Sequence, residues 1–136
     1  MKKLLFICLA AFAAASCTQE KQQSKPLYMW FDCEANYATL SHPDSIRYYV
    51  SKIHDMGFTD VVVDVKSIMG ETLYKSDIAP YMGEWDGVTR PENYDLLGYF
   101  IEEGHKLGMR VHGSLNVFAG GHNYFDRGII LSLIHI

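Results

Sequence analysis

Polar side chains that could bind a ligand stand at the ends of three apolar segments of this 136-residue sequence. Carboxylates accept hydrogen bonds and exchange protons, and amide, amine and imidazole groups add donors beside them. The candidates are Asp32 and Glu34, then Asp64 and Lys66, and finally His112 and Asn116. Polar groups placed repeatedly at one end of apolar segments are costly to bury without a partner, so the set favours a polar-ligand site. For any single residue, an ion-pair network such as Lys66 with Glu34 is the structural alternative.

Aromatic side chains near these residues narrow the class of ligand. Sugars stack their C–H faces on aromatic rings while their hydroxyl groups bond to acids, amides and amines. The connection at residues 67–92 is long for a compact domain, which favours a functional role. Within it, Tyr74 and Trp85 are predicted to contact a carbohydrate. Trp30, inside the first apolar segment, is predicted to belong to the core.

The hydrophobic pattern predicts alternating strands and helices that would carry these side chains. Continuous apolar runs indicate strands covered on both faces, and apolar residues at i, i+3, i+4 and i+7 indicate amphipathic helices. The predicted order is a strand at residues 27–34, a helix from Pro43 that stops before Gly57, a strand at 59–66, the long connection, a helix at 93–107 and a strand at 109–118.

Strands that alternate with helices form parallel βαβ units, which build either an open doubly wound sheet or a (β/α)₈ barrel. An open nucleotide-binding sheet would carry a glycine-rich turn after its first strand, and residues 32–36 contain neither GxGxxG nor GxxxxGK[ST]. Polar residues at all three strand ends match the barrel instead. Because a barrel needs about 250 residues, we expect an α/β fold that is a partial TIM barrel, with only its first three βα units present.

The N-terminal residues predict export. Lys2 and Lys3 precede an apolar run at residues 4–15, and small residues lead to Cys17. This order is similar to a bacterial lipoprotein signal, in which the cysteine carries the lipid. We therefore expect a signal peptide at residues 1–16 and a lipidated Cys17 that opens a flexible tether over 17–26. The protein would then be lipid-anchored in the membrane of the cell envelope, and plain secretion is the alternative.

The rest of the chain divides into a domain and a short foreign tail. Residues 27–130 are predicted to be the N-terminal part of the barrel. Residues 131–136 look like a translated sequencing adapter, so the natural protein is expected to continue. Cys33 has no second cysteine beside it in this domain, which favours a small buried hydrophobe over a disulfide or zinc ligand.

Composition excludes one class of partner. Lys and Arg number 12 against 16 Asp and Glu, for a net charge of −4. Nucleic-acid binding needs clustered basic residues, and the sequence has no such stripe. We therefore expect no nucleic-acid partner. Separately, we expect no cofactor.

Four segments together resemble the glycosyl hydrolase-like family 10. They are WFDCEANY, FTDVVVDVKSIMGETLYKSDIAPYMGEW, YDLLGYFIEEGHKLGMRVHGSLNVF and GGHNYFDRG. The resemblance implies a (β/α)₈ domain that hydrolyses carbohydrate at the cell envelope, and it implies a sugar site lined by Asp32, Glu34, Asp64, Lys66, His112 and Asn116. Glycoside cleavage needs two carboxylates that flank the scissile bond. The principal acids of such families lie on later strands, so the catalytic residues are expected downstream and this chain is expected to be inactive.

Two further functions stay open. One is a carbohydrate-binding surface lipoprotein without catalysis. The other is a metal-dependent hydrolase on the same barrel, with Asp32, Asp64 and His112 as ligands. The sequence lacks the His-x-His of many metal-binding barrels and the HExxH helix motif, which disfavours the metal alternative.

Overall fold

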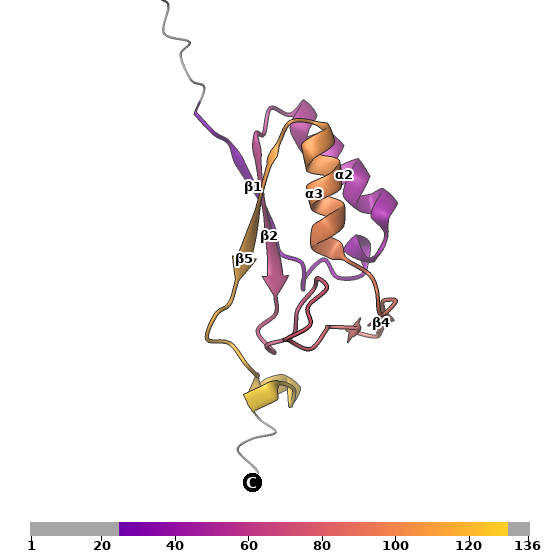
Figure 1. The fold of residues 1–136 in the computed structure, drawn as a ribbon, viewed down its shortest axis with the longest axis vertical. Coiled ribbons are helices and arrows are strands. Elements are labelled where there is room, and N and C mark those ends of the chain that lie inside the picture. Colours follow the sequence, from indigo (N-terminus) through magenta and orange to yellow (C-terminus); the bar gives the residue numbers. More distant parts are fainter. Residues whose placement is uncertain (1–24, 131–136) are drawn as a thin grey trace, which may run out of the picture.

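A computed structural model describes residues 25–130 of the chain. Its main sheet contains three parallel strands in the order β1-β2-β5, where β1 is Tyr28–Phe31, β2 is Asp60–Lys66 and β5 is Arg110–Leu115. Helix α2 (Pro43–Asp55) connects β1 to β2, and helix α3 (Leu96–Lys106) precedes β5. Both helices lie on the same side of this sheet (Figure 1). The predicted order of strands and helices is confirmed, although β1 and β5 are shorter than the predicted segments.

Local sequence signals explain where the helices begin and end. Pro43 occupies the first position of α2, where its missing N–H costs nothing and its fixed φ suits a helix. Gly57 follows with φ 92°, a left-handed conformation that ends the helix as predicted. Helix α3 starts after Asp95, whose Oδ1 accepts a hydrogen bond of 3.0 Å from the Gly98 N–H. This N-cap starts α3 three residues later than the periodicity suggests.

Alternation along β2 separates its two faces. Val61, Val63 and Val65 are buried against the helix side, where Phe100 of α3 also lies in the core. Val62, Asp64 and Lys66 alternate with them and are half-buried. The prediction that both faces of this strand are covered is wrong for residues 25–130, because both helices pack on one face.

Trp30 lies on the opposite, open face of the sheet. Its neighbours Met29 and Phe31 pack toward the helices, and the Phe31 ring lies 4.9 Å from the Phe100 ring. Since successive side chains of a strand point to opposite faces, Trp30 points away from the core and is 60% exposed. Among residues 25–130, the assignment of Trp30 to the core is therefore wrong.

The long connection after β2 is compact and ordered. Its backbone folds back on itself, since the Thr72 N–H donates to the Pro80 carbonyl and the Met82 N–H donates to the Thr72 carbonyl, both at 2.8 Å. A two-stranded hairpin follows, made of β3 (Glu84–Trp85) and β4 (Val88–Thr89). Figure 1 shows the segment gathered beyond the carboxyl end of β2. Short 3₁₀ turns η1 (Thr39–Ser41) and η2 (Asn123–Phe125) complete the described residues.

Three parallel strands with intervening helices occur in barrels and in open sheets alike. The partial TIM barrel therefore stays a prediction. Neither helix of residues 25–130 has the length and apolar composition needed to cross a membrane.

Candidate functional site

A tight hairpin displays Trp85 at the centre of the candidate site. The two residues between β3 and β4 are Asp86, with φ 49°, and Gly87, with φ 76°. Positive φ at both positions defines a type I′ turn, for which Asp-Gly is a preferred sequence. The Gly87 N–H donates to Glu84 Oε1 at 3.0 Å across the turn. Trp85 and Asp86 therefore have a fixed backbone.

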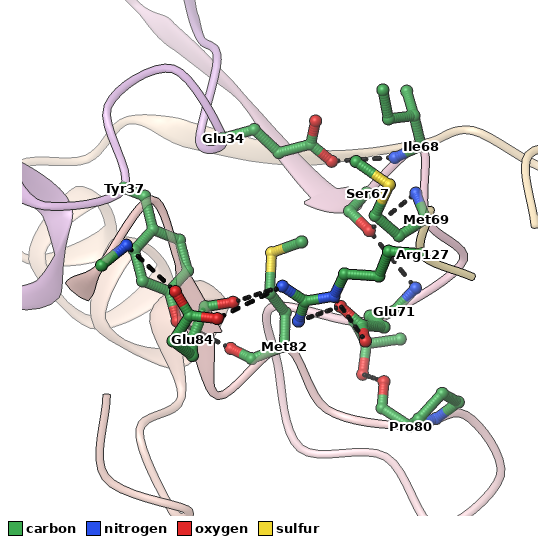
Figure 2. Close-up of polar contacts among 12 residues, drawn as sticks. Glu34, Tyr37, Ser67, Ile68, Met69, Glu71, Pro80, Met82, Glu84 and Arg127 are labelled. Atoms are coloured by element: carbon green, nitrogen blue, oxygen red, sulfur yellow. Dashed lines mark hydrogen bonds and ion pairs between the residues drawn. The ribbon is translucent and has the colours of Figure 1, made fainter. Parts of the chain in front are cut away.

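Arg127 ties this hairpin to two other segments. Its Nη1 donates to the Glu84 carbonyl at 2.8 Å, and its Nη2 lies 2.7 Å from Glu71 Oε2. Figure 2 shows the guanidinium between Glu71 and Glu84. The Arg127 Cζ also lies 5.9 Å from the centre of the Trp85 ring. One side chain thus holds three segments that are far apart in the sequence.

Two hollows lie beside the Trp85 ring. The first has a volume of about 140 Å³ and is lined by Glu34, Ala35, Tyr37, Ala38, Trp85, Asp86 and Val88. The second has a volume of about 320 Å³ and is lined by Trp85, Asp86 and Phe125. An indole ring and carboxylates in one concave surface can bind a ligand that has both apolar C–H faces and hydroxyl groups.

Glu34 supplies the carboxylate of the first hollow. Its Oε1 accepts a hydrogen bond of 2.8 Å from the Ile68 N–H (Figure 2), which ties the turn after β1 to the turn after β2. Burial raises the pKa of Glu34 above its ordinary value, and the nearby charges of Asp32 and Asp64 raise it further. Glu34 is therefore a fixed hydrogen-bond acceptor with a raised pKa.

Among the other predicted site residues, Asp32 shapes a turn. Its Oδ1 accepts hydrogen bonds from the Glu34 N–H at 3.2 Å and the Ala35 N–H at 2.9 Å. Both acids lie in the turn that follows β1 and not on the strand itself, so the alternation of a strand does not set their directions.

Asp64 and Lys66 share the open face of β2, as their spacing predicts. Asp64 Oδ2 accepts a hydrogen bond of 3.0 Å from Trp30 Nε1. Lys66 Nζ donates to the carbonyls of Asn116 and Ala119 at 2.6 and 2.5 Å. The alternative of a Lys66–Glu34 ion pair finds no support among the ion pairs of residues 25–130. Lys66 instead fastens the segment after β5 to the sheet.

The His112 side chain contacts Asp60, the first residue of β2, and so lies near the amino ends of the strands. Its Nε2 lies 2.8 Å from Asp60 Oδ1, and Arg110 donates to both oxygens of that carboxylate at 2.7 and 2.8 Å. The hydrogen bonds from Arg110 hold the pKa of Asp60 well below its usual range. Tyr74 packs against the hydrophobic core and does not line the two hollows. Of the predicted set, only Glu34 and Trp85 therefore meet at the hollows.

The described residues contain no metal-ligand group that matches the metal alternative. Across residues 25–130, no three His, Cys, Asp or Glu side chains are grouped to hold an ion. Cys33 is fully buried, as predicted, and burial raises the pKa of its thiol to about 12. The thiol therefore stays protonated and unreactive. Cys17 lies outside the described residues.

Comparison with known proteins gives a different relationship from the one the sequence motifs suggest. No family model matches the chain. An S-layer-related protein from Niallia circulans is 30% identical to it over 103 residues, or 71% of this chain. The relative is named for a surface layer. The chain spans about 6% of the length of that relative. At this coarse level, the similarity agrees with the predicted location in the cell envelope.

The resemblance to the glycosyl hydrolase-like family 10 is therefore wrong, and so is the prediction of a glycoside hydrolase fragment. Neither is supported by a family model, and the relative found is an S-layer-related protein. The physical reason lies in what the motifs encode. Apolar strands that end in polar residues satisfy the burial requirements of parallel βα units in general, so they do not specify one family.

Three residues of the site were absent from the sequence prediction: Asp86, Phe125 and Arg127. The Asp86-Gly87 pair between Trp85 and Val88 is a hairpin signal that could have identified the turn. No local pattern marks Arg127, because its partners Glu71 and Glu84 lie far from it in the sequence.

Proposed function

We propose that this chain is part of a cell-surface protein that binds a neutral carbohydrate of the envelope at Trp85. The observation that carries the proposal is the half-buried Trp85 ring between two hollows, with Glu34 in one and Asp86 in both. The S-layer-related relative supports the location at the surface. A fixed ring offers a stacking face, and the carboxylates accept hydrogen bonds from hydroxyl groups.

Charge at the site favours a neutral polymer over an acidic one. Arg127 is already paired with the carboxylates of Glu71 and Glu84, and Lys66 is bound to backbone carbonyls. Neither Arg127 nor Lys66 is therefore free to offset the negative charge of the acids that line the hollows. A polyanion would therefore meet like charge without compensation.

The proposal is tested by binding of the purified chain to insoluble cellulose, chitin and starch, with polygalacturonate as the acidic comparison. We expect retention on at least one neutral polymer and none on polygalacturonate. Trp85→Ala should weaken binding by about tenfold or more, because truncating a central aromatic contact removes more than 1 kcal/mol.

Trp30→Ala is the matched control, since Trp30 is the other tryptophan of the sequence and lies on the open face of the sheet. It should leave binding unchanged. Loss of binding in Trp30→Ala with full binding in Trp85→Ala would contradict the assigned site, and preference for polygalacturonate would contradict the ligand class.

We also propose that the surface attachment is a lipid on Cys17. The order of the basic pair, apolar run and small residues before that cysteine supports it. Cells that express the chain should incorporate a palmitate analogue into it, and Cys17→Ala should abolish the label. Label that persists in the variant would contradict the anchor.

For the fold, we propose that β1, β2 and β5 are the first three strands of a (β/α)₈ barrel. Support comes from the sequential neighbours β1-β2-β5, all parallel, and from helices on one face only. In a barrel, the opposite face would line the interior. A structure of the longer protein in which β1 lacks a closing partner strand would contradict this.

A further inference from the structure

The two hollows beside Trp85 share a wall. Trp85 and Asp86 line both of them, so the hollows meet along the tip of the hairpin. Their volumes, about 140 and 320 Å³, place each at or below the lower end of the roughly 300–1,000 Å³ usual for ligand pockets. A ligand that used the whole concave surface would therefore have to cross the indole ring.

Aromatic rings continue from Trp85 into the second hollow. The Phe125 ring centre lies 4.9 Å from that of Trp85 at an interplanar angle of 65°, and Tyr124 lies 5.0 Å from Phe125 at 90°. Tyr124 is 84% exposed. These rings reach the hairpin because Arg127, which follows them in the chain, bonds to the Glu84 carbonyl. The outcome is a row of rings that starts at Trp85 and extends along η2.

At least one carboxylate lines each of the two hollows. Glu34 is fixed in the first hollow by the Ile68 N–H (Figure 2), and Asp86 stands at the boundary between the hollows. Carboxylates are acceptors for the hydroxyl groups that every unit of a sugar chain repeats. Trp85 and Asp86 thus serve both hollows, while Glu34 adds an acceptor to the first and Phe125 adds a ring to the second.

We propose that the site takes a chain of at least two sugar units, with one unit in each hollow and the chain crossing the Trp85 ring. This inference rests on the carbohydrate binding proposed above and names its ligand as an oligosaccharide or polysaccharide chain. A single monosaccharide would occupy one hollow and leave the Phe125 side of the site empty.

The test is a titration of the whole purified chain with matched saccharides of increasing length. The probes are glucose, cellobiose and cellotriose, and N-acetylglucosamine with its β-1,4-linked dimer and trimer. In whichever of the two series binds, we expect the trisaccharide to bind about tenfold more tightly than the monosaccharide, because both hollows then contribute. Phe125→Leu, which keeps apolar bulk but removes the ring, should reduce that gain to about twofold and leave monosaccharide affinity unchanged.

Tyr48→Ala, an exposed tyrosine on α2, is the matched control and should bind like the unaltered chain. Asp86→Asn keeps the turn, because Asn also tolerates positive φ, and should weaken the monosaccharide and the trisaccharide together. Equal affinity for monosaccharide and trisaccharide, or a full length-dependent gain in Phe125→Leu, would overturn the inference while the binding function stood. Absence of binding by every saccharide would overturn the proposed function and this inference with it.

Discussion

Arg90 is a buried cation that stacks on a tyrosine. It is 3% exposed, its Cζ lies 3.6 Å from the Tyr37 ring centre, and it donates to Ser41 Oγ at 2.8 Å and to the Tyr37 carbonyl at 2.9 Å. Burial lowers its pKa. Within residues 25–130 none of the ion pairs includes Arg90, so the planar guanidinium is stabilised by the Tyr37 ring, by the Tyr94 ring at 5.2 Å and by two neutral oxygens.

Arg90→Lys should destabilise the chain by about 2–4 kcal/mol, because a lysine cannot reproduce the stacked, forked geometry and leaves a buried charge poorly bonded. Urea denaturation measures the loss. Arg47→Lys, at a mostly exposed arginine of α2, is the control and should change stability by less than about 0.5 kcal/mol. Equal effects of the two substitutions would contradict the role given to Arg90.

The raised pKa of Glu34 should make the free energy of unfolding depend on pH. Burial raises its pKa in the folded state, so the folded chain holds this proton more tightly than the unfolded chain. The resulting contribution favours folding below the ordinary glutamate pKa and is lost as pH rises through the raised value. Glu34→Gln, which keeps an acceptor for the Ile68 N–H, should therefore raise the melting temperature at about pH 7 relative to the unaltered chain.

The gain of Glu34→Gln should shrink at about pH 3, well below the ordinary glutamate pKa, where the carboxyl is mostly protonated in both states. We expect a stabilisation within about 1 kcal/mol, measured by thermal unfolding at the two pH values. Glu92→Gln, at an exposed position, controls for the general loss of a charge. A stabilisation that is larger at the lower pH would have the wrong sign and would contradict the raised pKa.

The contact between α3 and β5 depends on a helix position without a side chain. A Cβ built on Gly104 would lie 2.7 Å from Val111 Cγ2, closer than such atoms approach each other. Helix and strand therefore meet at Gly104. The sequence shows only a glycine on the second predicted helix, because the turn at residues 107–109 brings Val111 back against it.

Gly104→Ala should destabilise the chain by about 1–3 kcal/mol through overpacking, despite the better helix propensity of alanine. The same substitution in a Val111→Ala background should cost less, since the contacting methyl group is removed. A double-mutant cycle by urea denaturation measures the coupling. Strictly additive effects would show that helix and strand do not touch at this point.

At the scale of the whole molecule, one face of the parallel sheet is covered and the other is open among residues 25–130. Tyr28 and Trp30 of β1 are both more than half exposed on the open face. Parallel sheets normally have both faces covered. In the proposed barrel, this open face would line the interior, where side chains of the other strands would cover it.

Tryptophan fluorescence tests this exposure, because the sequence contains only Trp30 and Trp85. The variant Trp85→Phe leaves Trp30 as its tryptophan, and Trp30→Phe leaves Trp85. Acrylamide should quench Trp30 more efficiently than Trp85, because Trp30 is 60% exposed and Trp85 packs partly against the core. Circular dichroism confirms that both variants are folded. A Trp30 that resists quenching would show that the open face is covered, for example by self-association.

Local signals along the chain are sufficient to predict the helices and strands. Pro43, Gly57 and the β-branched run of β2 act through neighbours in the chain, so their consequences could be predicted from local rules. The shared face of Asp64 and Lys66 follows from the two-residue period of a strand in the same way. The Asp86-Gly87 turn obeys such a rule too, although it was missed within the long connection.

Which side chains meet depends on long-range packing that local signals do not encode. Trp30 looks like a core residue in the sequence, and it is exposed because both helices pack on the other face. Arg127 meets Glu71 and Glu84, and His112 turns to Asp60, through contacts across long stretches of chain. Such contacts depend on how strands register and helices cross, which no local pattern encodes. The strand ends therefore suggest a polar site, while the packing of the hairpin against η2 supports the proposed site at Trp85.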